Sequence, residues 1–157
     1  MPKQTAKQSL ADVFLVNNRI DLFVLGNIPD KDLGVAHSAR SRTIADQFAH
    51  LHNVRIMWLE IHKPALAKTL KKIEKGKATK KLLEESLKKS GDAMADYFRE
   101  LGSPEKMAKA KKSPYNFFAY VTAHEAHHRG QILLHLKYAG VPFDRDKSYA
   151  IWEWEKM

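Results

Sequence analysis

A length of 157 residues fits one domain, so we expect residues 1–157 to form a single folded unit. Hydrophobic residues make up 44% and charged residues 29%, which excludes a disordered chain, and the absence of cysteine excludes disulfides and thiolate metal ligands. The formal net charge of +9 makes nucleic acid a partner to consider, because clustered lysine and arginine attract phosphates.

The first element in chain order is a helix over residues 9–26. It is predicted by residues that recur at helical spacing, namely Leu10, Phe14, Asn17, Asp21 and Val24. Gly26 and Pro29 mark its end. The polar loop that follows is long enough to cover one end of a helical bundle.

A second helix is expected to begin near Ser41 or Thr43, because either hydroxyl could cap exposed amide groups. It continues to Pro64, where the helix breaks or a new one starts. One largely apolar stripe of this helix also carries a histidine, and consists of Gln47, His50, Val54, Met57 and Ile61. A histidine at such a position calls for an explanation.

Two further helices are predicted at residues 79–101 and 115–138, and residues 102–104 end the first of them. Its buried side is expected to consist of Leu82, Leu83, Leu87, Met94, Tyr97 and Phe98. The tail, with Trp152 and Trp154, is expected to pack back onto the bundle or onto a second subunit. Four long amphipathic helices without an alternating strand pattern predict an all-α four-helix bundle.

The excess of lysine is concentrated in residues 68–89, where glutamates are mixed in, and again in residues 106–112. Such runs are most often a solvated helix face with its flanking loop, and these lack interleaved aromatic residues. We therefore do not expect a nucleic-acid partner. No segment has the length and apolar character of a signal peptide or a membrane span, so we expect a cytoplasmic protein without a membrane partner.

Four of the eight histidines lie in one short segment of the last predicted helix, VTAHEAHHRGQILLHL at residues 121–136. His124 and His128 are four residues apart, so both rings lie on one face and can reach a common ion. His127 is rotated away from this pair. A neighbouring helix must supply a third ligand. His50 is our first choice because of its stripe, and His52, about 200° around the helix, is the second.

Three histidine ligands would leave positions open for water or substrate, which is the arrangement of a catalytic metal site. Glu125 and Gln131 are candidates for orienting groups around the metal, and the alternative roles are an exposed carboxylate and a packing amide. Histidines without any metal are the competing interpretation, because two histidines at this spacing also occur by chance. No glycine-rich phosphate loop, GxSxG motif or di-iron pattern suggests another chemistry.

The sequence resembles the DinB (damage-inducible) family, also described as DinB/YfiT-like metalloenzymes. The segments that carry the resemblance are FAHLHNVRIMWLE, HEAHHRGQILLHLKYAGVP, LVNNRIDLFVL and IWEWEKM, which span nearly the whole chain. The resemblance implies that the family's metal-binding histidines correspond to His50, His124 and His128. It also implies an up-down-down-up four-helix bundle, homodimers, and a divalent ion, with zinc or nickel ahead of iron or manganese.

Members of the wider superfamily resemble transferases and isomerases that use a low-molecular-weight thiol. We therefore expect a metal-dependent enzyme, either a thiol S-transferase or a hydrolase, that acts on a small-molecule substrate. The alternatives are a non-catalytic metal- or ligand-binding stress-response protein and a basic nucleic-acid-associated protein. The sequence assigns no catalytic residue beyond the three metal ligands.

Overall fold

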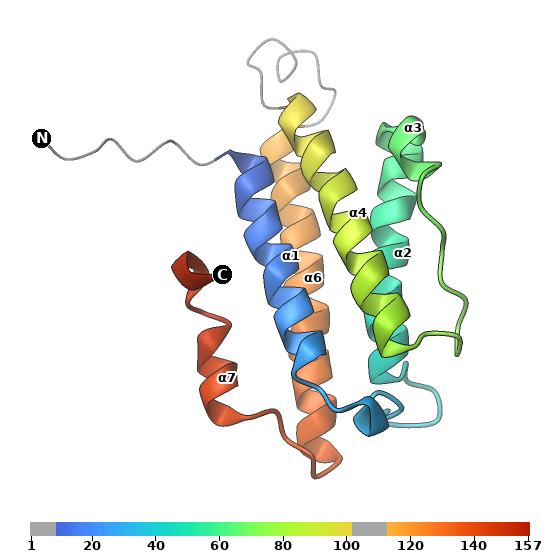
Figure 1. Cartoon of the computed structure of the whole chain (residues 1–157), viewed down its shortest axis with the longest axis vertical. Coiled ribbons are helices and arrows are strands. Elements are labelled where there is room, and N and C mark those ends of the chain that lie inside the picture. Colours follow the sequence, from blue (N-terminus) through green and yellow to red (C-terminus); the bar gives the residue numbers. More distant parts are fainter. Residues whose placement is uncertain (1–8, 102–112) are drawn as a thin grey trace, which may run out of the picture.

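A computed structural model describes residues 9–101 and 113–157, and every regular element in these ranges is a helix, as predicted. Four long helices lie side by side in Figure 1: α1 (Leu10–Gly26), α2 (Ile44–His62), α4 (Lys80–Leu101) and α6 (Pro114–Tyr138). The short elements are η1 (Asp30–Asp32), α3 (Pro64–Ala67), α7 (Arg145–Ala150) and η2 (Trp154–Lys156). Among the described residues, no helix has both the length and the apolar character needed to cross a membrane.

The helices α2 and α4 run in the same direction (Figure 1). α1 descends to η1, α2 rises from there to α3, and the extended segment 68–79 returns the chain to the lower end, where α4 starts. α6 descends again, parallel to α1. α1 and α2 each pack against both α4 and α6. This order of directions is the one expected of an up-down-down-up bundle.

Side-chain caps set the helix boundaries close to the predicted ones. The Ser9 hydroxyl accepts a hydrogen bond from the backbone N–H of Asp12, and the Asp12 carboxylate accepts one from the backbone N–H of Ser9, which is a capping box at the start of α1. At the start of α2, Thr43 and not Ser41 is the cap, because its hydroxyl accepts the backbone N–H of Asp46 at 3.0 Å. Pro64 begins the short helix α3. The predicted terminator at residues 102–104 lies outside the described residues.

The core consists of two apolar clusters. The first contains Val24, Leu25, Phe48, Leu51, Leu83, Leu87, Ile132 and Leu136. The second contains Phe14, Leu59, Met94, Phe98 and Val121. Between the two, each long helix contributes buried polar residues, and we call this set the polar layer: Asn17, Asn18, Asp21, Arg55, Ser90, Glu125 and Arg129. The polar layer therefore crosses the middle of the bundle, between the two apolar clusters.

The buried stripe of α2 is not the predicted one. Met57 and Ile61, expected on the apolar stripe with His50, are 40% and 63% exposed. The side of α2 that faces the core instead carries Ile44, Phe48, Leu51, Arg55 and Leu59. Both sets of residues fit helical spacing. The set that faces the core is the one with an arginine, whose charge is neutralised by buried partners. The stripe with His50 therefore lies at the edge of the bundle.

One smaller prediction about burial also needs correction. Leu82, expected on the buried side of α4, is 39% exposed, whereas the other five predicted residues are buried. In the tail, Ile151 packs against the first apolar cluster, as one of the two alternatives for the tail predicted, whereas Trp152 is 75% exposed. The lysines of segment 68–79 are exposed, as predicted; residues 106–112 lie outside the described residues.

A close approach between α1 and α4 explains the glycine inside α4. A Cβ atom at Gly91 would collide with the side-chain amide of Asn18, which belongs to the polar layer. Glycine costs helix stability relative to alanine, and here it removes the atom that would keep the two helices apart.

Candidate metal centre

The helices α2 and α6 bring three histidines together: His50, His124 and His128. Each offers one ring nitrogen, and these nitrogens lie within 4.8 Å of one another. The ring centroids of His128 are 4.7 Å from those of both His50 and His124. Two imidazole nitrogens bound tetrahedrally to one ion lie about 3.3 Å apart, so modest rotations of the rings reach that geometry. These are the three residues selected from the sequence.

A glutamine of α2 orients one of these rings. Gln47 Oε1 lies 3.2 Å from His128 Nδ1, and Gln47 Nε2 lies 3.2 Å from Nδ1 of His135. Both bonds are satisfied when His128 Nδ1–H donates to Gln47, and when Gln47 donates to His135. His128 then keeps the Nε2 lone pair free for an ion, and a hydrogen bond from the other ring nitrogen is common among metal-binding histidines.

The local environment keeps the three histidines unprotonated. Burial, followed by the charges of Arg42 and His124, lowers the pKa of His50 to about 4. Burial also lowers the pKa of His128 to about 4, with His124 and His50 as the next contributors. The pKa of His124 is lowered as well, chiefly by burial. Neutral imidazole is the form that binds metal, so the cluster is ready to bind near neutral pH.

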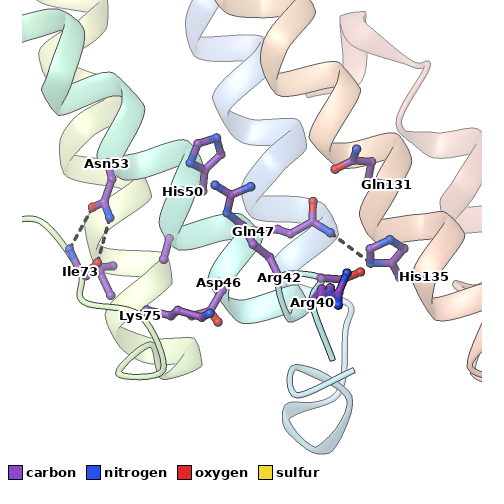
Figure 2. Close-up of a pocket in the computed structure, with 12 residues that line it drawn as sticks. Arg40, Arg42, Asp46, Gln47, His50, Asn53, Ile73, Lys75, Gln131 and His135 are labelled. Atoms are coloured by element: carbon purple, nitrogen blue, oxygen red, sulfur yellow. Dashed lines mark hydrogen bonds between the residues drawn. The ribbon is translucent and has the colours of Figure 1, made fainter. Parts of the chain in front are cut away.

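A cavity of about 660 Å³ lies beside the cluster, and His50 is part of its wall (Figure 2). The segment before α2, α2 itself, the returning segment 68–79 and α6 supply the remaining wall. Gln131, one of the orienting residues suggested by the sequence, lines this cavity and pairs with His127 at 2.9 Å. The volume falls in the range of small-molecule sites.

His52, the second choice as a ligand, lies away from the cluster. It is buried, and its Nε2 donates to the backbone carbonyl of Lys71 at 2.9 Å, which anchors the extended segment to α2. His127 is exposed on α6. The rotation of both residues away from the cluster agrees with the helical geometry used to set them aside.

Glu125 is not the exposed carboxylate of the alternative interpretation, and within the described residues it forms no hydrogen bond with the histidines, so any orienting role is indirect. It is buried, and it accepts hydrogen bonds from Arg55 Nε at 2.7 Å and Nη2 at 3.0 Å, and from Asn17. Burial alone would raise the pKa of Glu125, but Arg55 lowers it below its ordinary value. Glu125 thus stays ionised and ties α6 to α2, one residue from His124.

The remaining contacts of Arg55 reach the other two long helices. Its guanidinium donates to Asn18 at 2.7 Å and Asp21 at 3.1 Å on α1, and to the Leu87 carbonyl at 3.0 Å on α4. Arg129 pairs with the second oxygen of Asp21 at 2.7 Å. The polar layer therefore balances two arginines against two carboxylates, which fixes the spacing of the helices that carry the histidines.

Comparison with known families adds an independent result: the model of the DinB family matches residues 1–154. The chain belongs to the DinB family. The resemblance noted in the sequence is thereby confirmed over nearly the whole length. No curated protein matches the chain significantly.

The donor set of this DinB-family chain fits a divalent metal. Three neutral nitrogen donors converge, one of them with its tautomer fixed by Gln47, and the cluster among the described residues includes no carboxylate. Imidazole suits zinc, nickel and iron, and three protein ligands leave room for an exogenous one.

Two side chains of the site in this DinB-family chain, Gln47 and Arg42, were not assigned a role from the sequence. Gln47 precedes His50 by three residues and therefore shares its helix face, which was a usable signal. Arg42 lies before the helix cap, where spacing gives no information about direction. Its direction toward His50 is visible only in three dimensions (Figure 2).

Proposed function

We propose that this DinB-family protein is a metal-dependent enzyme, a thiol S-transferase or a hydrolase, with His50, His124 and His128 as the metal ligands. The observation that carries the proposal is the convergence of three unprotonated imidazoles beside an open cavity. A structural metal site has four protein ligands and no cavity, so this arrangement favours catalysis.

A divalent ion held there supplies Lewis acidity, which lowers the pKa of bound water or thiol and provides a nucleophile near neutral pH. The all-nitrogen donor set favours zinc or nickel, with iron or manganese next. Water and a low-molecular-weight thiol are the two candidate nucleophiles.

The chain's own residues hold and orient the reacting groups. Gln47 keeps the proton of His128 on Nδ1, so that Nε2 stays available. The pair Arg55–Glu125 holds α6 against α2, which keeps His124 and His128 opposite His50. The cavity admits the substrate from the side of His50. Geometry and protonation are therefore set before any ligand arrives, which reduces the cost of binding.

The first test is elemental analysis of protein purified without an affinity tag. About one metal per chain is expected in the parent, and loss of the metal is expected in His50→Ala and in His128→Ala. His127→Ala is the matched control, because His127 neighbours His128 on α6 but lies outside the cluster, so this variant should keep the metal. A parent that stays metal-free after reconstitution contradicts the proposal.

A second measurement separates catalysis from storage or sensing of a ligand. The metal-loaded parent is screened for transfer of a thiol to electrophiles and for hydrolysis of esters and amides, with the metal-free protein alongside. Turnover that depends on the metal supports the enzyme. Full metal occupancy with no product in either screen supports the non-catalytic alternative.

A further inference from the structure

The cavity beside the histidines has an unbalanced positive charge. Its wall contains three cations, Arg40, Arg42 and Lys75, and a single carboxylate, that of Asp46. Asp46 is buried, and its Oδ1 accepts the backbone N–H of Gly76 at 2.9 Å. Within residues 9–101 and 113–157, none of the three cations forms an ion pair.

Cations elsewhere on the described bundle are paired in some places, such as Lys72 with Glu60 at 2.9 Å, and form no ion pair in others, such as Arg19, Lys68 and Lys81. The cavity adds a different feature, because three cations share its wall with a single carboxylate, and that carboxylate is engaged. Such a concave basic surface attracts anions.

Arg42 is the cation nearest to the chemistry. Figure 2 shows its guanidinium directed toward His50, and its charge contributes to the lowered pKa values of all three histidines. The backbone beside Arg42 is held in place at the start of α2. Arg42 directly precedes the cap Thr43, and the backbone N–H of Ile44 donates to the carbonyl of Val35 at 2.9 Å. The exposed side chain of Arg42 therefore extends toward His50 from a backbone position that is held at the start of α2.

The charges of the proposed metal site and of Arg42 add up with nothing to offset them. Three neutral imidazoles leave a divalent ion fully charged, and Arg42 adds a further positive charge beside it. Glu125 is the carboxylate next to His124 in sequence, but it is paired with Arg55. Arg42 is exposed, so solvent weakens the repulsion between these like charges, and an anion bound between them would offset it further.

We propose that Arg42, assisted by Arg40 and Lys75, binds an anionic group of the substrate, so that the substrate is a small polar molecule with a carboxylate or phosphate. This inference rests on the proposed function, because the metal site determines where the reacting end of the substrate lies. The planar guanidinium matches both groups in a bidentate manner. Ala49 and Ile73 are the apolar residues of the wall, which disfavours a hydrophobic substrate.

The test is calorimetric titration of zinc-loaded protein, dialysed free of excess zinc, with inorganic phosphate and separately with succinate. Arg42→Gln should weaken binding of the preferred anion about tenfold or more, because a charge-assisted bidentate contact is lost. Arg19→Gln is the matched control, because Arg19 is an exposed arginine of α1 outside the cavity. This variant should bind the anion with the same affinity as the parent. The anion that binds more tightly identifies the group.

Metal content is measured on the same samples, so that the two proposals fail separately. Equal affinity in the parent and in Arg42→Gln, or no binding of either anion at millimolar concentration, overturns the anion site even with zinc bound. A parent without zinc overturns the proposed function instead. In that case the metal-free parent and metal-free Arg42→Gln are titrated with the same anions. A tenfold loss of affinity in the variant supports the anion site, and equal affinity overturns it.

Discussion

The polar layer and the histidine cluster both include polar side chains of α2 and α6, yet they differ in how completely these side chains are paired. In the polar layer, all three guanidinium nitrogens of Arg55 donate hydrogen bonds, and both oxygens of Glu125 accept them. In the cluster, Gln47 forms a hydrogen bond with the ring of His128. The rings of His50 and His124 have no hydrogen-bond partner among the described residues.

This difference separates two uses of buried polarity. A buried charged group that is fully paired is expensive to disrupt, because loss of one partner leaves the other charge buried and unpaired, so such a pair holds helices in register. Nitrogen atoms that converge without partners beside a cavity are available to an exogenous ligand. The two regions are therefore expected to respond to mutation in different ways.

The largest expected effect is on stability, from Arg55→Met. Removing the guanidinium leaves the buried carboxylates of Glu125 and Asp21 without their shared partner, which should cost about 3–5 kcal/mol of unfolding free energy. The measurement is urea denaturation followed by circular dichroism. The control is Arg99→Met, which breaks a half-exposed pair with Asp96 and should cost no more than about 1 kcal/mol. Similar losses in both variants would mean that the polar layer is not structural.

Gly91→Ala should destabilise the protein by about 1–3 kcal/mol, because the added methyl group forces Asn18 away from Arg55. Gly130→Ala is the control, because nothing lies near a Cβ atom at this position of α6. Alanine is a better helix former there and should stabilise by up to about 1 kcal/mol. Opposite signs for the same substitution are expected in thermal unfolding, and a shared sign would rule out the close approach of α1 to α4.

The fold was largely predictable because helix boundaries depend on local chemistry. Ser9 and Thr43 cap the helices that they precede, and the apolar spacing of the first helix selected residues that are buried. The histidine cluster was predictable for a similar reason. His124 and His128 share a helix face by spacing alone, so that only the third residue required a choice between helices.

The polar layer and the cavity were not predictable from spacing, since both depend on partners distant in the chain. Arg55 and Glu125 are 70 residues apart, and either one read by itself resembles an exposed helix residue. The second helix offered two stripes of equal periodicity, and the one with an arginine became the core because that arginine is neutralised. The cavity needs Lys75 from the returning segment opposite Arg42, which no local pattern reports.

The role of Gln47 is tested by metal affinity. Gln47→Leu removes the acceptor that holds the proton on His128 Nδ1, so affinity for zinc should fall about 10–100-fold, as measured by competition with a chromophoric chelator. Gln131→Leu is the control, because Gln131 lines the same cavity but bonds to His127. Its affinity should match the parent's. Equal losses in both variants would assign the effect to the cavity in general.

A last expected effect is the pH dependence of stability in the metal-free protein. His50 and His128 have pKa values of about 4 when folded and about 6.5 when unfolded, so the unfolded chain binds more protons between these values. Their contribution to the unfolding free energy is complete above pH 6.5 and is lost as the pH falls toward 4. The double variant His50→Gln, His128→Gln should therefore show a shallower loss between pH 7 and pH 5.

The comparison must be made as a difference between parent and variant, because the polar layer titrates in the opposite sense. Burial raises the pKa of Asp21 to about 7 against the effects of Arg129 and Arg55, so the folded state there binds more protons than the unfolded one. The contribution of Asp21 to the unfolding free energy therefore rises as the pH falls. Asp21 is present in both proteins, so this contribution cancels in the difference. A parent and double variant with the same pH dependence of the urea midpoint would show that the cluster is already protonated, and not poised for metal.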